Sequence, residues 1–144
     1  MREPEPIAND AEVHGIAVAI RDRWQSRTDS PFASIVVDHI ALQVTVYRVP
    51  GDAGFDADVQ SSGTDRVPVM VIDAPRNRAG NEAIRDAIMS TKDLPIRLWA
   101  AGLRSDGGGV DLLAEGDIVA AQTALDETYG PGAVLVEEGR VVPL

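Results

Sequence analysis

The residues best suited to bind a ligand are three arginines and an asparagine near the middle of the chain. Arg76, Arg78 and Arg85 lie close together in a sequence of net charge -10, and Asn81 lies between them. A helix is expected to begin in this segment, and arginines beside a helix N-terminus can hold an anion or a partner's carboxylate. The four residues are therefore a candidate anion-binding site. The simpler alternative is a solvated link between two halves of the chain.

Asp38 and His39 form a second candidate polar site. A carboxylate can orient a histidine that acts as a general base, but neighbouring side chains of a strand point to opposite faces. Their place at an expected hairpin tip instead predicts that Asp38 accepts hydrogen bonds from its own turn. His14, the other histidine, is expected on the polar edge of a helix.

Several chemistries are excluded by the residues they would need. The chain has no cysteine, which removes disulfides, thiolate catalysis and the common zinc sites. No Gly-x-Ser-x-Gly segment is present, and Gly107–Gly109 leads into an expected strand rather than into a phosphate-binding helix. Asp52, Asp56 and Asp58 are spaced like part of a calcium loop, but Gly63 occupies the position of its last acidic ligand. Helix capping and a wet helix face are predicted for these aspartates, and no metal or cofactor is expected.

The charge balance narrows the class of partner. Thirteen basic residues stand against 23 acidic ones, and such an acidic chain repels phosphate backbones and anionic lipid. Twelve of the basic residues are arginine, a bias that GC-rich coding, as in actinobacteria, also produces. We expect no nucleic-acid and no membrane partner. The polar, proline-broken N-terminus does not resemble a signal peptide, which predicts a cytoplasmic location unless a leader was trimmed.

Hydrophobic periodicity predicts five elements in each half of the chain. After a disordered leader over residues 1–9, we expect a helix over about 11–27, strands over 33–37 and 42–49, a helix over 52–61 and a strand over 67–72. The second half repeats this order, and a last hairpin through Glu138 and Gly139 would bring in Val141 and Val142. Trp24 and Trp99 are expected to pack in the core. The expected elements of the second half are a helix over 79–91, strands over 96–103 and 110–114, a helix over 118–129 and a strand over 133–136.

A shift of 65 residues superposes the two halves, since Gly51-Asp52 falls on Gly116-Asp117 and Val69 falls on Val134. The chain is therefore predicted to be α+β, with two tandem αββαβ modules over residues 10–75 and 76–144, antiparallel sheets and helices packed on one face of each. Chance alternation of short elements, or one continuous domain, is the alternative.

This order of elements resembles the propeptide modules of secreted α-lytic protease and streptogrisin-type serine proteases. The resemblance rests on the hairpin residues Val36-Val37-Asp38 and the return strand Val44–Val49. It implies a protein-binding scaffold that acts as a folding catalyst or inhibitor of a protease. No protease domain is expected beside it, and no position matches the family well enough to transfer a contact residue.

The sequence as a whole predicts a non-enzymatic protein-interaction protein, whose partner is another protein and whose strand edges or sheet face make the contact. The alternative is a small ligand-binding protein or enzyme with a pocket between the two modules, using Asp38, His39 or the arginine group. Self-association through the repeated modules is a third possibility.

Overall fold

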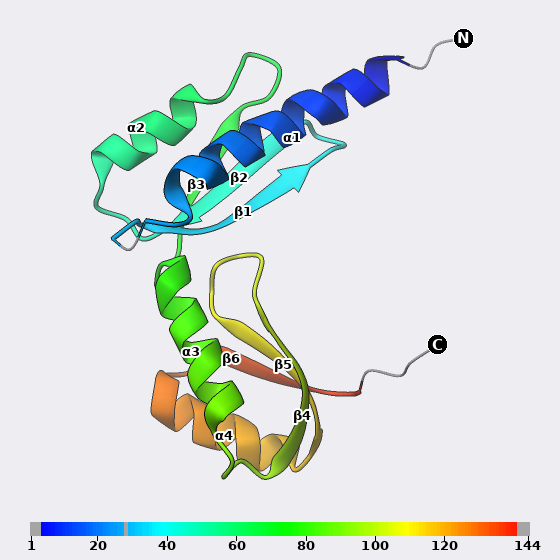
Figure 1. Ribbon diagram of the computed structural model, residues 1–144, viewed down its shortest axis with the longest axis vertical. Helices are drawn as coiled ribbons and strands as arrows, with labels where there is room; N and C mark the ends of the chain where they lie inside the picture. Colours follow the sequence, from blue (N-terminus) through cyan, green and yellow to red (C-terminus); the bar gives the residue numbers. More distant parts are fainter. Residues whose placement is uncertain (1–3, 28, 141–144) are drawn as a thin grey trace. The chain divides into compact units, whose positions relative to one another are not determined.

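The computed structural model describes residues 4–27 and 29–140, and its elements follow the predicted order in both halves (Figure 1). The α+β class and the repeated αββαβ order are confirmed. The first half contains α1 (Pro4–Trp24), β1 (Phe32–Asp38), β2 (Gln43–Arg48), α2 (Ala53–Ser61) and β3 (Val69–Asp73). The second half contains α3 (Arg78–Ser90), β4 (Ile96–Leu103), β5 (Val110–Gly116), α4 (Ile118–Tyr129) and β6 (Val134–Glu138).

The chain divides into two compact units. The first extends to Arg78 and also takes in Ser105–Gly107, and the second comprises the rest from Ala79 onward. The expected boundary, between residues 75 and 76, lies three residues before the boundary that the contacts define.

Each unit holds one three-stranded sheet, in the orders β1-β2-β3 and β4-β5-β6. The two hairpins are antiparallel, as predicted, but β3 runs parallel to β2 and β6 runs parallel to β5. The sheets are therefore mixed rather than purely antiparallel. The reason is the helix between the second and third strands, because a helical crossover returns the chain to start a parallel strand.

The first helix begins earlier than the sequence predicts. α1 starts at Pro4, so residues 4–9, expected as a leader, belong to a helix. A proline in the first turn is tolerated because the amide hydrogen it lacks has no partner within the helix. Residues 1–3 of the expected leader, and Val141 and Val142 of the expected last hairpin, lie outside the described residues.

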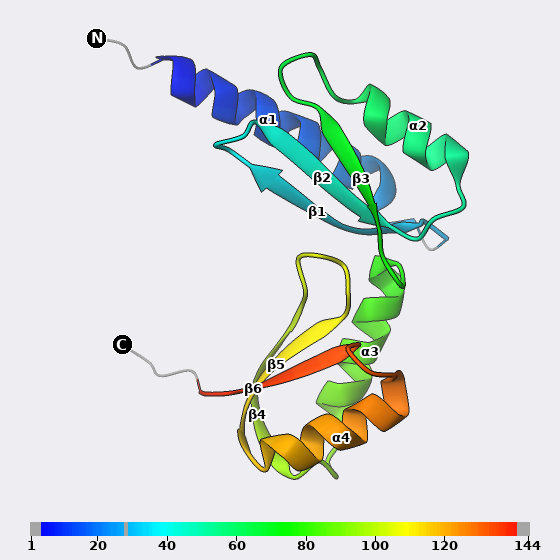
Figure 2. The same ribbon diagram turned by 180° about the vertical axis from the view of Figure 1, so that it is seen from behind.

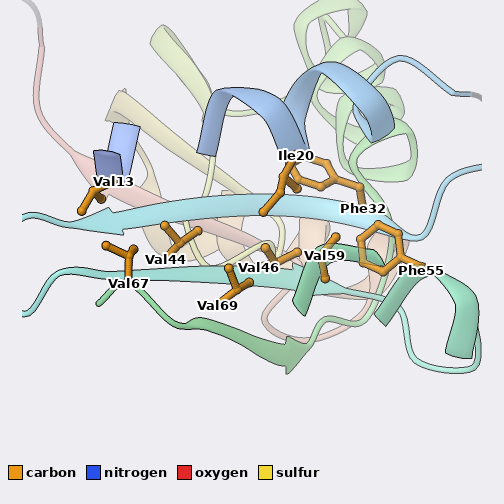
Figure 3. Packing of buried hydrophobic residues seen from close by; sticks show 9 residues of the cluster. All are labelled: Val13, Ile20, Phe32, Val44, Val46, Phe55, Val59, Val67 and Val69. Atoms are coloured by element: carbon orange, nitrogen blue, oxygen red, sulfur yellow. The ribbon is translucent and has the colours of Figure 1, made fainter. Parts of the chain in front are cut away.

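The core of the first unit lies between the sheet and its two helices, which pack on the same face (Figures 1 and 2). Val44 and Val46 of the central strand are fully buried. Val13 of α1 lies at one end of this core, and Phe55 and Val59 of α2 lie at the opposite end (Figure 3). The remaining buried members of this cluster are Ile20, Phe32, Val67 and Val69.

The core of the second unit repeats this arrangement with smaller side chains. Val110 and Leu112 of the central strand pack with Leu125 of α4 and Ile88 of α3. Trp99 is not a member of this core, although core packing is the prediction for it. It lies on the opposite face of the sheet, where its Nε1 donates to Glu115 at 2.8 Å and the Arg97 guanidinium covers its ring at 4.6 Å.

Trp99 leaves the core because it occupies a β-bulge. The register of β4 with β5 shifts between Leu98 and Ala100, and the register of β1 with β2 shifts between Phe32 and Ser34. A bulge inserts one unpaired residue and changes the alternation of side chains. The two bulges lie 66 residues apart, as do the pairs that flank them, so the repeat predicted from the sequence extends to the details of strand pairing.

Candidate functional site

The candidate site is an open groove of about 340 Å³ beside the edge strand β1. Helix α1 forms one wall, β1 forms the other, and a residue that opens α3 closes one end. Its lining residues are Arg21, Gln25, Phe32, Ser34, Ile35 and Arg78.

Local structure fixes the position of each wall. Arg21 lies in the last turn of α1, and its carbonyl accepts a 2.9 Å hydrogen bond from the Gln25 amide, which holds Gln25 beside it. On the other wall, Phe32 is anchored in the core, and its amide donates to the Ser30 hydroxyl at 3.1 Å. The β-bulge between Phe32 and Ser34 interrupts the alternation of side chains, so Ser34 does not follow Phe32 into the core and lines the groove instead.

Two arginines line the groove although the chain is acidic. Arg21 and Arg78 line it, and the Ser34 hydroxyl and the Gln25 amide add neutral polar groups. Within the described residues Arg21 forms no ion pair. A guanidinium in this setting can bind a carboxylate through two parallel hydrogen bonds.

The four residues of the predicted anion site do not all line this groove. Arg78 lines the groove, whereas Asn81 is buried, with 1% of its surface exposed. Arg85 forms an ion pair with its neighbour Asp86, with Nε and Oδ1 3.2 Å apart. Arg76 is half-buried just before α3 and does not line the groove. Of the predicted set, Arg78 alone belongs to this groove.

Asp38 takes the turn role that the sequence predicts. Its Oδ1 accepts hydrogen bonds from the amides of Ile40, at 3.0 Å, and Ala41, at 2.9 Å. Both acceptor contacts come from one carboxylate oxygen, so Asp38 holds the tip of the β1–β2 hairpin in shape. Ile40 stands at this tip with 97% of its surface exposed.

Asp52, Asp56 and Asp58, the aspartates with calcium-like spacing, all have partners within the protein. Of the two roles predicted for them, helix capping and a solvent-exposed helix face, only helix capping is confirmed. Asp52 caps α2, since its Oδ1 accepts from the Phe55 amide at 2.9 Å. Asp56 and Asp58 do not form a wet helix face, because each binds a side chain from another element.

Arg48 is the partner of Asp56. Its side chain is 11% exposed and contacts Asp56 through Nε at 2.7 Å and Nη2 at 2.9 Å, while Nη1 contacts Asp73 at 2.6 Å. These hydrogen bonds raise the pKa of the Arg48 guanidinium above its ordinary value. The alternation of β2 places Arg48 on the core-facing side with Val44 and Val46. An arginine on the apolar face of a predicted strand is therefore the sequence signal from which this ion pair could be predicted.

Asp58 joins α2 to α1. Its Oδ2 accepts from the Trp24 indole at 2.7 Å and from Arg23 Nε at 3.0 Å. The hydrogen bond from Trp24, helped by Arg23 and opposed by burial, holds the pKa of Asp58 below its usual value. The Trp24 ring packs edge-on against Phe55, with centroids 4.7 Å apart, so its predicted core role is confirmed together with this polar contact.

Within residues 4–27 and 29–140, no three histidine, aspartate or glutamate side chains come together as a metal site would require. None of the described helices is both long enough and apolar enough to span a membrane. The chain matches no family model, no curated protein and no solved structure.

Proposed function

We propose that this protein binds another protein, and that an extended segment of the partner pairs with the free edge of β1 while its carboxylates enter the neighbouring groove. The observation that carries the proposal is the position of Arg21 and Arg78 beside a strand that, among residues 4–27 and 29–140, has a neighbour, β2, on one side only. An edge strand offers unpaired backbone groups, and main-chain pairing at such an edge is a common mode of peptide recognition.

The form of the groove favours a chain segment over a small molecule. Small-ligand pockets enclose most of the ligand and are lined mainly by apolar groups. This groove is open and its lining is polar, with Phe32 buried beneath it. An extended segment compensates for the lack of enclosure because its backbone bonds to the strand, and an acidic side chain then meets a guanidinium.

The resemblance to protease propeptides suggests a serine protease as the partner, acting through inhibition or assisted folding. No residue match supports that narrower prediction, so the proposal is limited to an acidic extended segment. The other prediction, a small anion held by Arg76, Arg78, Asn81 and Arg85, has less support because Asn81 is buried.

A peptide-display selection against the purified protein tests the proposal. We expect enrichment of extended peptides rich in Asp and Glu. Arg21→Glu should lower the affinity for a selected peptide about tenfold or more, because one charge-assisted contact is lost. Arg140→Glu is the matched control, since it makes the same charge change at an exposed position that does not line the groove.

A second pair of variants tests the strand edge itself. Ser34→Asp places a carboxylate in the groove and should weaken the peptide, whereas Ser26→Asp, at an exposed turn position, should not. Amide exchange should slow in β1 when the peptide binds. Peptides without acidic enrichment, or equal binding to Arg21→Glu and Arg140→Glu, would contradict the proposal.

A further inference from the structure

A second pocket adjoins the groove at the start of β1, and its charged residues are acidic. It is an open pocket of about 350 Å³ that lies wholly within the first unit. Two aspartates line it, and none of the described residues that line it is basic. We call it the acidic pocket, and the lining residues that matter here are Asp29, Pro31, Val49, Pro50, Asp52 and Asn77.

The groove and the acidic pocket meet at two points of the chain. Pro31 lines the pocket, and the next residue, Phe32, lines the groove. In the same way, Asn77 lines the pocket and Arg78 lines the groove. The Nδ2 of Asn77 donates to the Ser30 carbonyl at 3.0 Å, which ties these two points together. A chain segment that lies in the groove and continues past Phe32 therefore enters the acidic pocket.

The two aspartates keep carboxylate oxygens available for a ligand. Asp29 is exposed and forms no ion pair or hydrogen bond among the described residues. Asp52 caps α2 through Oδ1 alone, so that its Oδ2 has no partner within residues 4–27 and 29–140.

The other walls of the acidic pocket are apolar. Pro31, Val49 and Pro50 place carbon atoms beside the two carboxylates. A lysine or arginine side chain matches both parts of such a pocket, because its methylene stem packs on apolar surface while its cationic head binds a carboxylate.

The backbone at the start of β1 determines where a partner segment stops pairing. Pro31 has no amide hydrogen, and its carbonyl accepts from the Val49 amide at 2.9 Å. The edge of β1 therefore begins at Phe32. Ser34 and Ile35 of the groove lie three and four residues after Pro31, which corresponds to about 10–13 Å along a strand.

We propose that the partner segment carries a basic side chain about four positions from its acidic residue, and that this basic side chain enters the acidic pocket. The inference rests on the proposed function, since both side chains belong to the segment that pairs with β1. Two sites of opposite charge also select the direction of the segment. A segment that lay in the reverse direction would bring like charges together, which is unfavourable.

Synthetic peptides that bind the whole chain test this inference. Lysine is placed in turn at each position of a selected acidic peptide, on both sides of its acidic residue. We expect a gain in affinity only at about four positions from that residue and on one side of it. Glutamate at the same position should bind roughly three- to tenfold more weakly than lysine, because a carboxylate then meets Asp29.

Reversal of the charge of the pocket provides the second measurement. Asp29→Lys should reverse the preference, so that the glutamate peptide binds better than the lysine peptide. Asp65→Lys is the matched control, since it makes the same charge change at an exposed aspartate that lines neither the groove nor the acidic pocket. It should keep the preference for lysine. Asp29→Lys should still lose affinity when Arg21→Glu is added, which shows that its groove is intact.

The outcomes separate this inference from the proposed function. A lysine that helps equally at every position, or the same preference in Asp29→Lys and Asp65→Lys, would overturn the inference. If affinity in these experiments still depends on the acidic residue and on Arg21, the proposed function stands without it. Peptide binding that does not respond to Arg21→Glu would contradict the proposed function and would remove this inference with it.

Discussion

Arg48 and Ala114 occupy matching places in the two central strands, since each is the partner of a residue just before a bulge, Phe32 in one sheet and Leu98 in the other. Arg48 binds two aspartates, whereas Ala114 is fully buried and has no polar side-chain atom that needs a partner. The two units thus stabilise the same position differently, one by an ion pair and the other by apolar packing. An ion pair with low exposure costs desolvation that a packed alanine avoids, so the charged solution is sensitive to the loss of one partner.

Replacing Arg48 alone should therefore lower the free energy of unfolding more than replacing Arg48 together with its partner Asp56. Arg48→Met keeps most of the side-chain stem but leaves Asp56 without its cation, and we expect a loss of about 1–3 kcal/mol in the free energy of unfolding. Adding Asp56→Ala should recover part of that loss. Urea unfolding of both single variants and the double variant provides the measurement, and simple additivity of the single losses would contradict this account.

Asp58 should make stability fall in acid. Its folded-state pKa lies below the usual value of 3.8, so the folded protein binds fewer protons there than the unfolded chain does. The stabilising contribution is present above pH 3.8 and is lost as the pH falls through the folded-state value.

The measurement compares urea unfolding at about pH 6 and about pH 3. The wild-type protein should lose more stability between these two conditions than Asp58→Asn does. Asp22→Asn, which removes a carboxylate from an exposed position of α1, controls for the change in net charge. An unchanged pH dependence in Asp58→Asn would refute the role given to this carboxylate.

At the scale of elements, the glycine-aspartate pairs before α2 and α4 are built alike. Gly51 and Gly116 have φ angles of 121° and 124°, and the aspartate after each caps its helix. The sequence predicts this feature well, because a glycine that breaks a strand and an aspartate that caps a helix are both local signals. The surroundings of the two glycines differ, and no local signal reports that difference.

Gly116→Ala should therefore be more costly than Gly51→Ala. Both substitutions force an alanine into a left-handed conformation, at a cost of roughly 1–3 kcal/mol. At Gly116 a Cβ would also lie 2.7 Å from the Pro95 carbonyl oxygen, whereas nothing lies within 4 Å of a Cβ at Gly51. Chemical denaturation of the two variants measures the difference, and equal losses would contradict it.

Each cap should contribute a similar amount. Asp52→Ala and Asp117→Ala each remove one hydrogen bond to a free helix amide, at 2.9 Å and 3.1 Å. We expect each to lower the free energy of unfolding by about 0.5–2 kcal/mol. Asparagine at either position should restore most of the loss, since it also accepts from the amide; failure of that rescue would show that the negative charge is the main contribution.

The bulges limit how far elements can be predicted. Alternation is read correctly in β2, where Val44, Val46 and Arg48 share a face. It fails at Trp99, because one inserted residue turns that side chain away from the core. The spacing of the core-facing residues does carry a sign of the bulge, since Leu98 and Ala101 are separated by three positions instead of two.

At the scale of the whole molecule, the chain maintains two separate hydrophobic clusters. Among the described residues, the buried members of one belong to the first unit and those of the other to the second. Element order and the internal repeat could be predicted because they depend on local periodicity. The groove could not, because Arg21, Ser34 and Arg78 are brought together from three separate parts of the sequence.

A destabilising substitution in one hydrophobic cluster should leave the stability of the other cluster unchanged. Leu112→Ala should destabilise the second unit by about 2–5 kcal/mol, and Val46→Ala, which removes fewer buried methyl groups, should destabilise the first unit by less. Hydrogen exchange read amide by amide should speed up only in the unit that carries the substitution. Faster exchange throughout the chain in either variant would show that the two units open together.

The change of offset between the two units shows where this chain accepts a change of length. The offset is 66 residues through both hairpins and their bulges, and it becomes 65 at Gly51 and Gly116. The first unit thus has one residue more between Arg48 and Gly51 than the second unit has between Ala114 and Gly116. In the first unit this segment follows the end of β2, whereas in the second unit Glu115 and Gly116 are still paired with β4. An insertion inside a hairpin would turn every following side chain to the wrong face. The segment between Arg48 and Gly51, after the end of β2, is therefore the place to graft a loop or a tag.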